Sequence, residues 1–164
     1  MVKIVRGSDM TSRTRHVAQA AAIAAAAVVA ATSGHASQCV PVAGSGSYIG
    51  PPAPTSVPLI IYAHTDNART AFNLLVPGGA LGFSGGRDSQ PDPEHYTLYV
   101  DTITQSQNGK LLPDTPAQGV CTLLVNADAS RFLDLECKAV AGGKTLTLSF
   151  KDDGKPHPAP TSCT

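Results

Sequence analysis

Four cysteines limit what this chain can fold into more than any other feature of its sequence. Cys39, Cys121, Cys137 and Cys163 all lie after residue 36 of the 164-residue chain. An even number of cysteines in a small exported domain indicates disulfide bridges, and four cysteines allow three pairings. A zinc site is the weaker interpretation, since the sequence contains no Cys-x-x-Cys pair. We therefore expect two disulfide bridges that stabilise the fold.

The pattern of apolar residues selects one of the three pairings. Every second residue is apolar or Cys in segments 121–125 and 133–137, which is typical of two strands that each bury one face. Folding them about turn formers in 126–132 gives a hairpin, and a one-residue slip would turn the whole buried set to solvent. The remaining bridge, Cys39 to Cys163, then joins the two ends of the domain. The expected hairpin pairs are Cys121 with Cys137, Leu123 with Leu135, and Val125 with Leu133.

The first 36 residues have the order of an export signal. A basic stretch precedes the 15-residue apolar run 17–31, which is followed by Gly34-His35-Ala36. A spanning helix needs roughly 20 apolar residues, so a cleaved signal is favoured over a membrane anchor. The Ala-rich core is typical of bacterial signals, and either Met1 or Met10 fits as the start. We expect a signal peptide over 1–36 and a protein in the periplasm, at the cell surface or in the medium.

Cys39 leaves a lipid anchor open as an alternative to a bridge, because bacterial lipoproteins are cleaved just before a Cys. Their pattern has a small residue before that Cys and an apolar residue such as Leu three positions before it. This chain has Gln38 and Ala36 at those positions, so the resemblance is poor. We therefore favour the disulfide.

Charge argues against some partners. After residue 36 the chain has eight Lys and Arg against eleven Asp and Glu, a net charge of −3. A mildly acidic domain without a basic patch is not expected to bind nucleic acid. We expect no cofactor and no metal site, and an unknown protein or small ligand as partner.

Composition and patterning favour a β fold. All 13 Pro and 13 of the 15 Gly follow residue 36, which favours turns and short strands. We expect a Pro/Gly/Ser-rich lead-in without regular pairing over 37–58, an antiparallel β domain over 59–150, and a Pro-rich tail over 151–164 closed by a disulfide. Alternation predicts a three-stranded meander over 120–150. The fold class is mainly β, either a small antiparallel sandwich or a sheet with one short helix.

The short helix is expected over residues 66–76. Ala68, Ala71, Phe72, Leu75 and Val76 form a helical stripe, with Thr65 or Asp66 as the cap. Phe72, Leu74 and Val76 equally fit a strand. We favour the helix.

One polar loop is the expected ligand-binding region. It brings three carboxylates within seven residues, a spacing that matches no defined calcium loop. A solvated loop without a ligand is the alternative. Tyr99 follows on the face opposite Leu98 and Val100, so we expect it to be an exposed aromatic contact. The candidate ligand-binding residues are Arg87, Asp88, Asp92, Glu94, His95 and Tyr99.

A hydrolase is the alternative to a binding module. Gly82-Phe83-Ser84-Gly85-Gly86 matches the G-x-S-x-G nucleophile pattern, but no helix pattern follows it. His64, Asp66 and His95 form a second candidate group, which no sequence signal brings together. We therefore expect an exported, non-enzymatic binding or structural module, with a small secreted hydrolase as the alternative.

Overall fold

The fold consists of eleven strands. The computed structural model describes residues 37–65, 67–128 and 130–163, and it contains no helix within them. The predicted signal peptide, residues 1–36, lies outside the described residues. The strands are β1 (Gln38–Ile49), β2 (Thr55–His64), β3 (Thr70–Val76), β4 (Gly79–Gly85), β5 (Arg87–Ser89), β6 (His95–Gln107), β7 (Lys110–Leu111), β8 (Thr115–Val125), β9 (Phe132–Ala141), β10 (Lys144–Asp152) and β11 (Thr161–Ser162).

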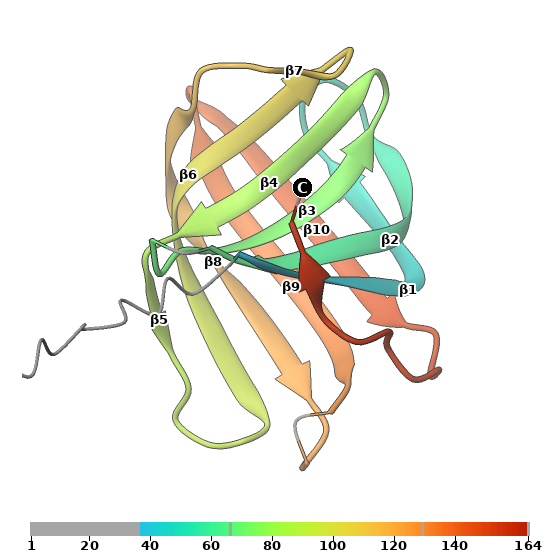
Figure 1. The fold of residues 1–164 in the computed structure, drawn as a ribbon. Coiled ribbons are helices and arrows are strands. Elements are labelled where there is room, and N and C mark those ends of the chain that lie inside the picture. The colour runs from blue at the N-terminus through green and yellow to red at the C-terminus, as the bar shows by residue number, and fades with distance from the viewer. Residues whose placement is uncertain (1–36, 66, 129, 164) are drawn as a thin grey trace, which may run out of the picture. The chain divides into compact units, whose positions relative to one another are not determined.

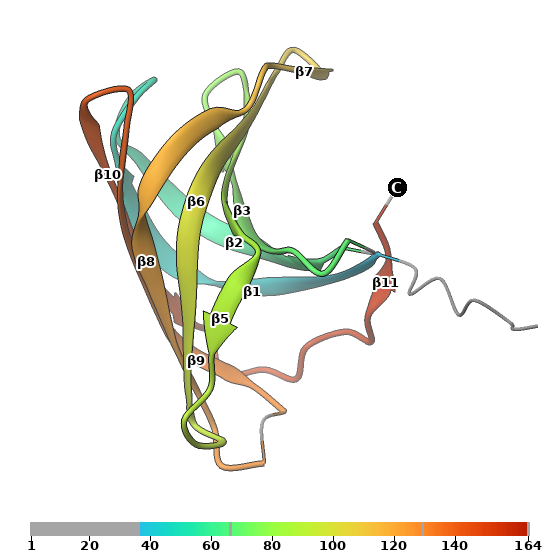
Figure 2. The same cartoon turned by 90° about the vertical axis from the view of Figure 1, so that its left-hand side faces the viewer.

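Eight of these strands close into an antiparallel barrel (Figure 1). The order around the ring is β1, β2, β3, β4, β6, β8, β9 and β10, and β10 pairs back onto β1. The short strands β5 and β7 add to β6, and β11 adds to the beginning of β1 (Figure 2). The predicted mainly β class is confirmed. The predicted sandwich, or sheet with one helix, is wrong, because the first and last long strands pair and leave no open sheet.

The seam between β1 and β10 depends on glycine. A Cβ at Gly44 would lie 2.0 Å from the Lys151 carbonyl oxygen, and one at Gly46 would lie 2.2 Å from the Ser149 carbonyl oxygen. Only residues without a side chain allow the two strands to approach this closely. The expectation of an unpaired lead-in over 37–58 is therefore wrong, because its glycines serve strand pairing as well as turns.

Proline is tolerated in β1 because of where it lies. Pro41 falls between Cys39, the last partner of β11, and Gly44, the first partner of β10. That stretch of β1 has a ladder partner only on its β2 side. A missing N–H is acceptable where one side of a strand is unpaired. Proline therefore does not exclude a strand here.

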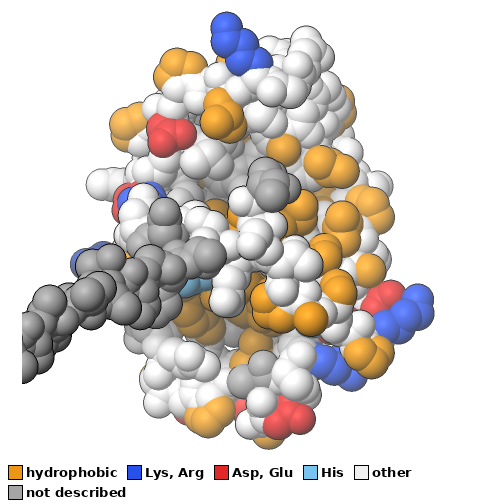
Figure 3. Space-filling view, in the orientation of Figure 1, with side chains coloured by type: hydrophobic (Ala, Val, Ile, Leu, Met, Phe, Trp, Pro, Cys, Tyr) orange, Lys and Arg blue, Asp and Glu red, His pale blue; other side chains and the backbone are white. Residues whose placement is uncertain are grey.

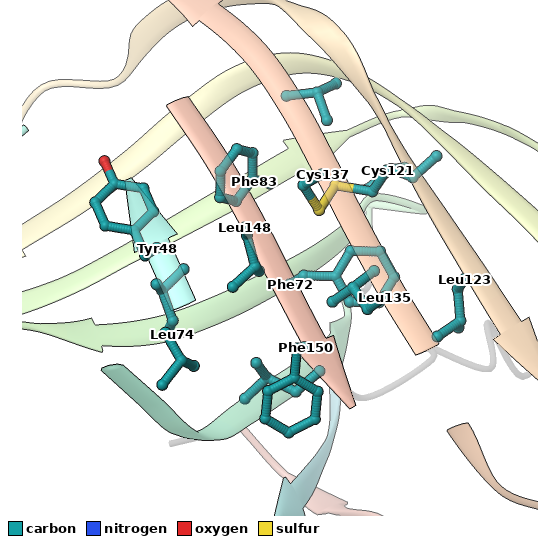
Figure 4. Close-up of a cluster of buried hydrophobic side chains, with 14 of the residues drawn as sticks. Tyr48, Phe72, Leu74, Phe83, Cys121, Leu123, Leu135, Cys137, Leu148 and Phe150 are labelled. Carbon is teal, nitrogen blue, oxygen red and sulfur yellow. A yellow bond between two sulfur atoms is a disulfide. The ribbon is translucent and has the colours of Figure 1, made fainter. Parts of the chain in front are cut away.

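Side chains from all eight barrel strands fill the interior (Figure 4). Alternate residues along each strand point inward, as period-2 patterning requires. The disulfide between Cys121 and Cys137 lies among them, and both cysteines are buried. The largest fully buried side chains are Tyr48, Phe72, Phe83, Phe150, Ile60, Leu74, Leu81, Leu98, Ile103, Leu135, Leu148 and Val42.

The predicted cysteine hairpin is confirmed over most of its length. Cys121 pairs with Cys137 and Leu123 pairs with Leu135. The third predicted pair is wrong, since Val125 lies opposite Phe132 after a shift in register. This irregularity at the end of β8 places an aromatic ring where Leu133 was expected. The predicted meander is also confirmed, as β8, β9 and β10.

The helix expected over residues 66–76 is wrong. Residues 70–76 form β3, which pairs with β2 on one side and β4 on the other. Ala68 has a φ of 58°, so the proposed helical stripe is broken before the strand begins. Phe72 and Leu74 point into the core, as the strand alternative required. Two flanking strands therefore override a local helical pattern.

The predicted bridge between the domain ends is also confirmed. Cys39 and Cys163 are joined, with their Cα atoms 5.2 Å apart. The bridge uses the Cys39 sulfur that a lipid would need. Beside it, β11 pairs with Gln38 and Cys39 of β1. The Pro-rich tail therefore returns to the start of the domain.

The outer surface differs from one side to another. In the view of Figure 3, hydrophobic side chains gather on the outside of β2 and the strands beside it. Leu59 and Ile61 of β2 line a small cleft there with Leu75 of β3. The opposite side, formed by β5, β6 and β8, faces the viewer in Figure 2. That second side carries the predicted ligand-binding residues.

Candidate binding surface

The six predicted ligand-binding residues lie on one hairpin. Arg87 and Asp88 belong to β5, His95 and Tyr99 belong to β6, and Asp92 and Glu94 lie in the turn between them. Pairing of β5 with β6 places Arg87 directly opposite Tyr99. The structure thus brings Arg87 against Tyr99 and, in the turn, Asp92 against His95, but it does not gather all six at one point.

Arg87 and Tyr99 form a stacked pair on the outside of the barrel. The guanidinium carbon of Arg87 lies 4.4 Å from the centre of the Tyr99 ring, a cation–π contact. Tyr99 stays 37% exposed, which agrees with its predicted outward position. The pair borders an open groove of about 460 Å³. The groove is lined by Arg87, Tyr99, Val100, Asp101, Ala117, Gln118 and Gly119.

Asp101 lines the same groove and is held by Arg69, which immediately precedes β3. The Arg69 guanidinium contacts both carboxylate oxygens of Asp101. The Gly86 amide also donates to Asp101 Oδ2 at 3.3 Å. The Arg69 guanidinium is the main reason why the pKa of Asp101 lies below its ordinary value. This wall of the groove therefore carries an ion pair that is fixed in position.

Sequence reasoning missed this ion pair. Arg69 and Asp101 are 32 residues apart, on segments that lie side by side only after the barrel has formed. No motif or spacing links them. The usable signal is weak: Asp101 follows Tyr99 by two residues, so on a strand it lies on the same outward face.

Two carboxylates of the hairpin, Asp92 in the turn and Asp88 on β5, form hydrogen bonds with neighbouring residues of the same hairpin. Asp92 accepts hydrogen bonds from the backbone amides of Glu94 and His95, both at 2.9 Å, and its Oδ1 lies 2.8 Å from His95 Nδ1. The contact with His95 is the largest cause of the lowered pKa of Asp92. Asp88 accepts a hydrogen bond from the Tyr96 hydroxyl at 2.8 Å. These carboxylates therefore order the hairpin.

The carboxylates do not converge on a metal site. Across residues 37–65, 67–128 and 130–163, no three His, Cys, Asp or Glu side chains are grouped as metal ligands would be. Asp88 and Asp92 instead use the separate partners just described. Nothing in the hairpin geometry points to bound calcium.

The described residues of the alternative hydrolase, Ser84, His64 and His95, each contact residues outside that group. Ser84 is buried, and its Oγ accepts a hydrogen bond from Arg69 Nε at 3.4 Å. His64 contacts the Thr70 hydroxyl, and His95 contacts Asp92. Asp66 lies outside the described residues. Arginine cannot take a proton from serine, so the described contacts of Ser84 contain no general base.

Comparisons of this chain with known proteins find no relative. No family model matches the chain, and neither a curated protein nor a solved structure is detectably similar to it. Within the described residues, no helix has the length and hydropathy that crossing a membrane requires.

Proposed function

We propose that this protein is an exported, non-enzymatic binding module that contacts its partner through the groove between β5, β6 and β8. The stacked pair of Arg87 and Tyr99 carries the proposal. Arg and Tyr are enriched among the residues that dominate binding energy at protein interfaces. Stacking fixes the guanidinium before a partner arrives, so less side-chain entropy is lost on binding.

The strands beside the pair extend the contact surface. Val120 of β8 lies opposite Tyr99 of β6, and Val140 of β9 lies opposite Gln118 of β8. Val120 is 41% exposed and Val140 is 46% exposed. The groove therefore continues into an apolar area next to fixed charges. This combination suits a protein surface better than a small molecule, which usually binds in a more enclosed site.

The disulfides support an oxidising location. Both bridges are formed and no described cysteine is free. Bridges of this kind persist outside the reducing cytoplasm. An exported bacterial protein, with residues 1–36 as its signal, accounts for both the bridges and the apolar run.

Intact mass measurement tests the export part of the proposal. We expect secreted protein that begins near Ser37, carries no lipid, and gains four hydrogens on reduction of its two bridges. An uncleaved amino terminus contradicts the signal. An added lipid mass contradicts the bridge at Cys39.

Site-specific photocrosslinking tests the binding surface. A photoreactive residue at Gln118, inside the groove, is compared with one at Ser45, an exposed position on β1. With periplasmic and extracellular proteins of the expressing bacterium, we expect a discrete adduct only from position 118. R87A and Y99A should abolish it while thermal unfolding stays unchanged. Equal adducts from both positions, or adducts that survive both substitutions, contradict the proposal.

A second assay addresses the hydrolase alternative. A fluorophosphonate probe labels activated serines, so a hydrolase built on Ser84 would be labelled and its S84A variant would not. We expect no difference between the two proteins. Labelling that depends on Ser84 would replace the binding proposal with an enzymatic one.

A further inference from the structure

The chain after β10 forms a strap across one end of the barrel. We define the strap as residues 153–163, which run from the end of β10 to Cys163 (Figures 1 and 2). The Asp153 amide donates to the Ala43 carbonyl at 3.1 Å, and the Cys39–Cys163 bridge fixes the far end. The strap is therefore anchored at both ends, and it has no regular structure between β10 and the two-residue strand β11.

One side chain of the strap turns inward. Among residues 153–162, all of which are described, only His157 is not exposed. Its side chain is 10% exposed, whereas the flanking Pro156 and Pro158 are exposed. The strap thus uses a single ring to contact the end of the barrel.

The barrel supplies an aromatic wall for that ring. The centres of the Phe132 and His157 rings lie 5.5 Å apart at 68°, an edge-to-face arrangement. The Tyr62 ring also packs against Phe132, with centres 5.3 Å apart, and the centres of the Tyr62 and Phe72 rings lie 5.7 Å apart. A column of rings therefore leads from the barrel core to the imidazole.

The barrel also supplies a buried hydrogen-bond acceptor. The Asp152 side chain is 2% exposed, and its Oδ2 lies 2.9 Å from His157 Nε2. A carboxylate only accepts hydrogen bonds, so Nε2 is the donor. The Gly154 amide donates to Asp152 Oδ1 at 2.5 Å, and Arg131 Nε faces Oδ2 at 3.6 Å. These contacts hold the carboxylate in position independently of the imidazole.

We propose that this end of the barrel is a binding site for a small planar heterocycle with an N–H donor, and that His157 occupies it as an internal ligand. Phe132 and Asp152 belong to β9 and β10, whereas the ring that fills the space between them comes from the strap. Removing the ring leaves an apolar wall and takes from the buried Oδ2 of Asp152 its hydrogen bond to His157, so that Oδ2 faces Arg131 Nε at 3.6 Å, beyond hydrogen-bond distance. This is an unfavourable state that a free heterocycle would relieve. The site uses other strands than the groove and does not depend on the proposed function.

The strap controls access to this site. A tethered ligand has an effective concentration in the millimolar range or above, so a free heterocycle must compete with His157. Without the Cys39–Cys163 bridge, the far anchor consists of the two-residue pairing of β11 with β1 and the hydrogen bond from the amide of residue 163 to the Ser37 carbonyl. The tethered ring is then held less tightly. Reduction of this bridge is therefore expected to open the site.

Imidazole binding tests the proposal. We expect oxidised H157A to bind imidazole with a millimolar dissociation constant, followed by NMR of the Phe132 and Tyr62 rings. Wild-type protein should bind at least about tenfold more weakly because of the tethered ring, and C39S/C163S should lie between them. In H157A, 1-methylimidazole, which has no N–H, should bind more weakly than imidazole. The double variant D152L/H157A, which has no acceptor at position 152, should lose this preference.

Several outcomes would overturn the proposal. Folded H157A that shows no saturable imidazole binding, or that binds imidazole and 1-methylimidazole equally, contains no such site. Equal affinity in wild-type protein and H157A would show that imidazole binds elsewhere. If H157A does not fold alone, its refolding yield in imidazole is compared with that in 1-methylimidazole, and equal yields also reject the proposal.

Discussion

The two ends of the barrel are closed in different ways. At the end near Pro51, the Tyr48 hydroxyl donates to the Pro51 carbonyl at 2.6 Å, a contact between residues three positions apart. At the strap end, the Cys39–Cys163 bridge spans 124 residues. The first closure forms with the turn between two neighbouring strands. The second requires the start and end of the domain to meet, which carries a larger loop-closure cost.

Removing the long-range bridge should have the largest effect on stability. For a loop of 124 residues, the chain-entropy relation gives a loss of about 5 kcal/mol in C39S/C163S. For the separation of 16 residues in C121V/C137V, the same relation gives roughly 3 kcal/mol. Valine keeps volume at the buried pair, so cavity formation contributes little.

Urea unfolding followed by tyrosine fluorescence measures both losses. Hydrogen exchange locates them, and C39S/C163S should loosen β11 and the start of β1 before the Pro51 end. Equal losses in the two variants, or loosening that begins at the Pro51 end, would contradict the difference between the ends.

The seam that supports both ends should be the next most sensitive feature. In G44A the new methyl group meets the Lys151 carbonyl oxygen, so β1 and β10 must separate at a cost of about 1 to 3 kcal/mol. G86A is the matched control, because the nearest neighbour of its new methyl group is Arg69 Nη1 at 3.4 Å, an ordinary contact distance. Denaturant unfolding should show little change in G86A. A G44A variant as stable as G86A would show that the seam adapts without glycine.

The sequence predicts the parts of this molecule in which partners are close along the chain. Cys121 and Cys137 lie on adjacent strands of one hairpin, so alternation of apolar residues suffices to pair them. Arg87 and Tyr99 also share one hairpin, and both were among the predicted site residues. Local pattern thus gives the strands and part of the groove.

Barrel closure was not predictable in the same way. It pairs Gly44 with Asp152, and the glycines of β1 appear in the sequence as breaks in a strand pattern. Their close approach to β10 becomes evident only when both strands are in place. Arg69 and Asp101 share this difficulty, since no periodic signal links residues that meet across the folded barrel.

The Pro51 end should respond to loss of one hydroxyl and to alkaline pH. Y48F removes the donor to the Pro51 carbonyl, with an expected loss of about 1 kcal/mol. Burial raises the pKa of Tyr48 to about 12 from an ordinary value of 10.0. The unfolded chain therefore loses its proton first, so this stabilisation is present below pH 10 and falls as the pH rises toward 12.

Unfolding free energies at pH 8 and pH 11 separate these effects. Wild-type protein should lose more stability between the two pH values than Y48F does. Burial also raises the pKa values of Tyr62 and Tyr96, so Y48F should retain part of the alkaline loss. The same loss in both proteins would mean that Tyr48 does not contribute to it.

The smallest expected effect concerns the ion pair outside the barrel, toward the strap end. Side chains of Arg69 and Asp101 are 31% and 53% exposed, and an ion pair this exposed contributes less than about 1 kcal/mol. A double-mutant cycle with R69Q and D101N measures this coupling.

The coupling should also depend on pH. The pKa of Asp101 is lowered in the folded protein, so the contribution is present above its ordinary value of 3.8 and is lost as the pH falls through the lowered pKa. Unfolding measured at pH 7 and pH 2.5 should therefore show a smaller coupling at pH 2.5. Because the Tyr48 contribution is lost only at alkaline pH, acid should weaken this outer contact while the Pro51 end keeps its hydrogen bond. Coupling of the same size at pH 2.5 and pH 7 would show that the contact between Arg69 and Asp101 does not depend on the charge that protonation removes.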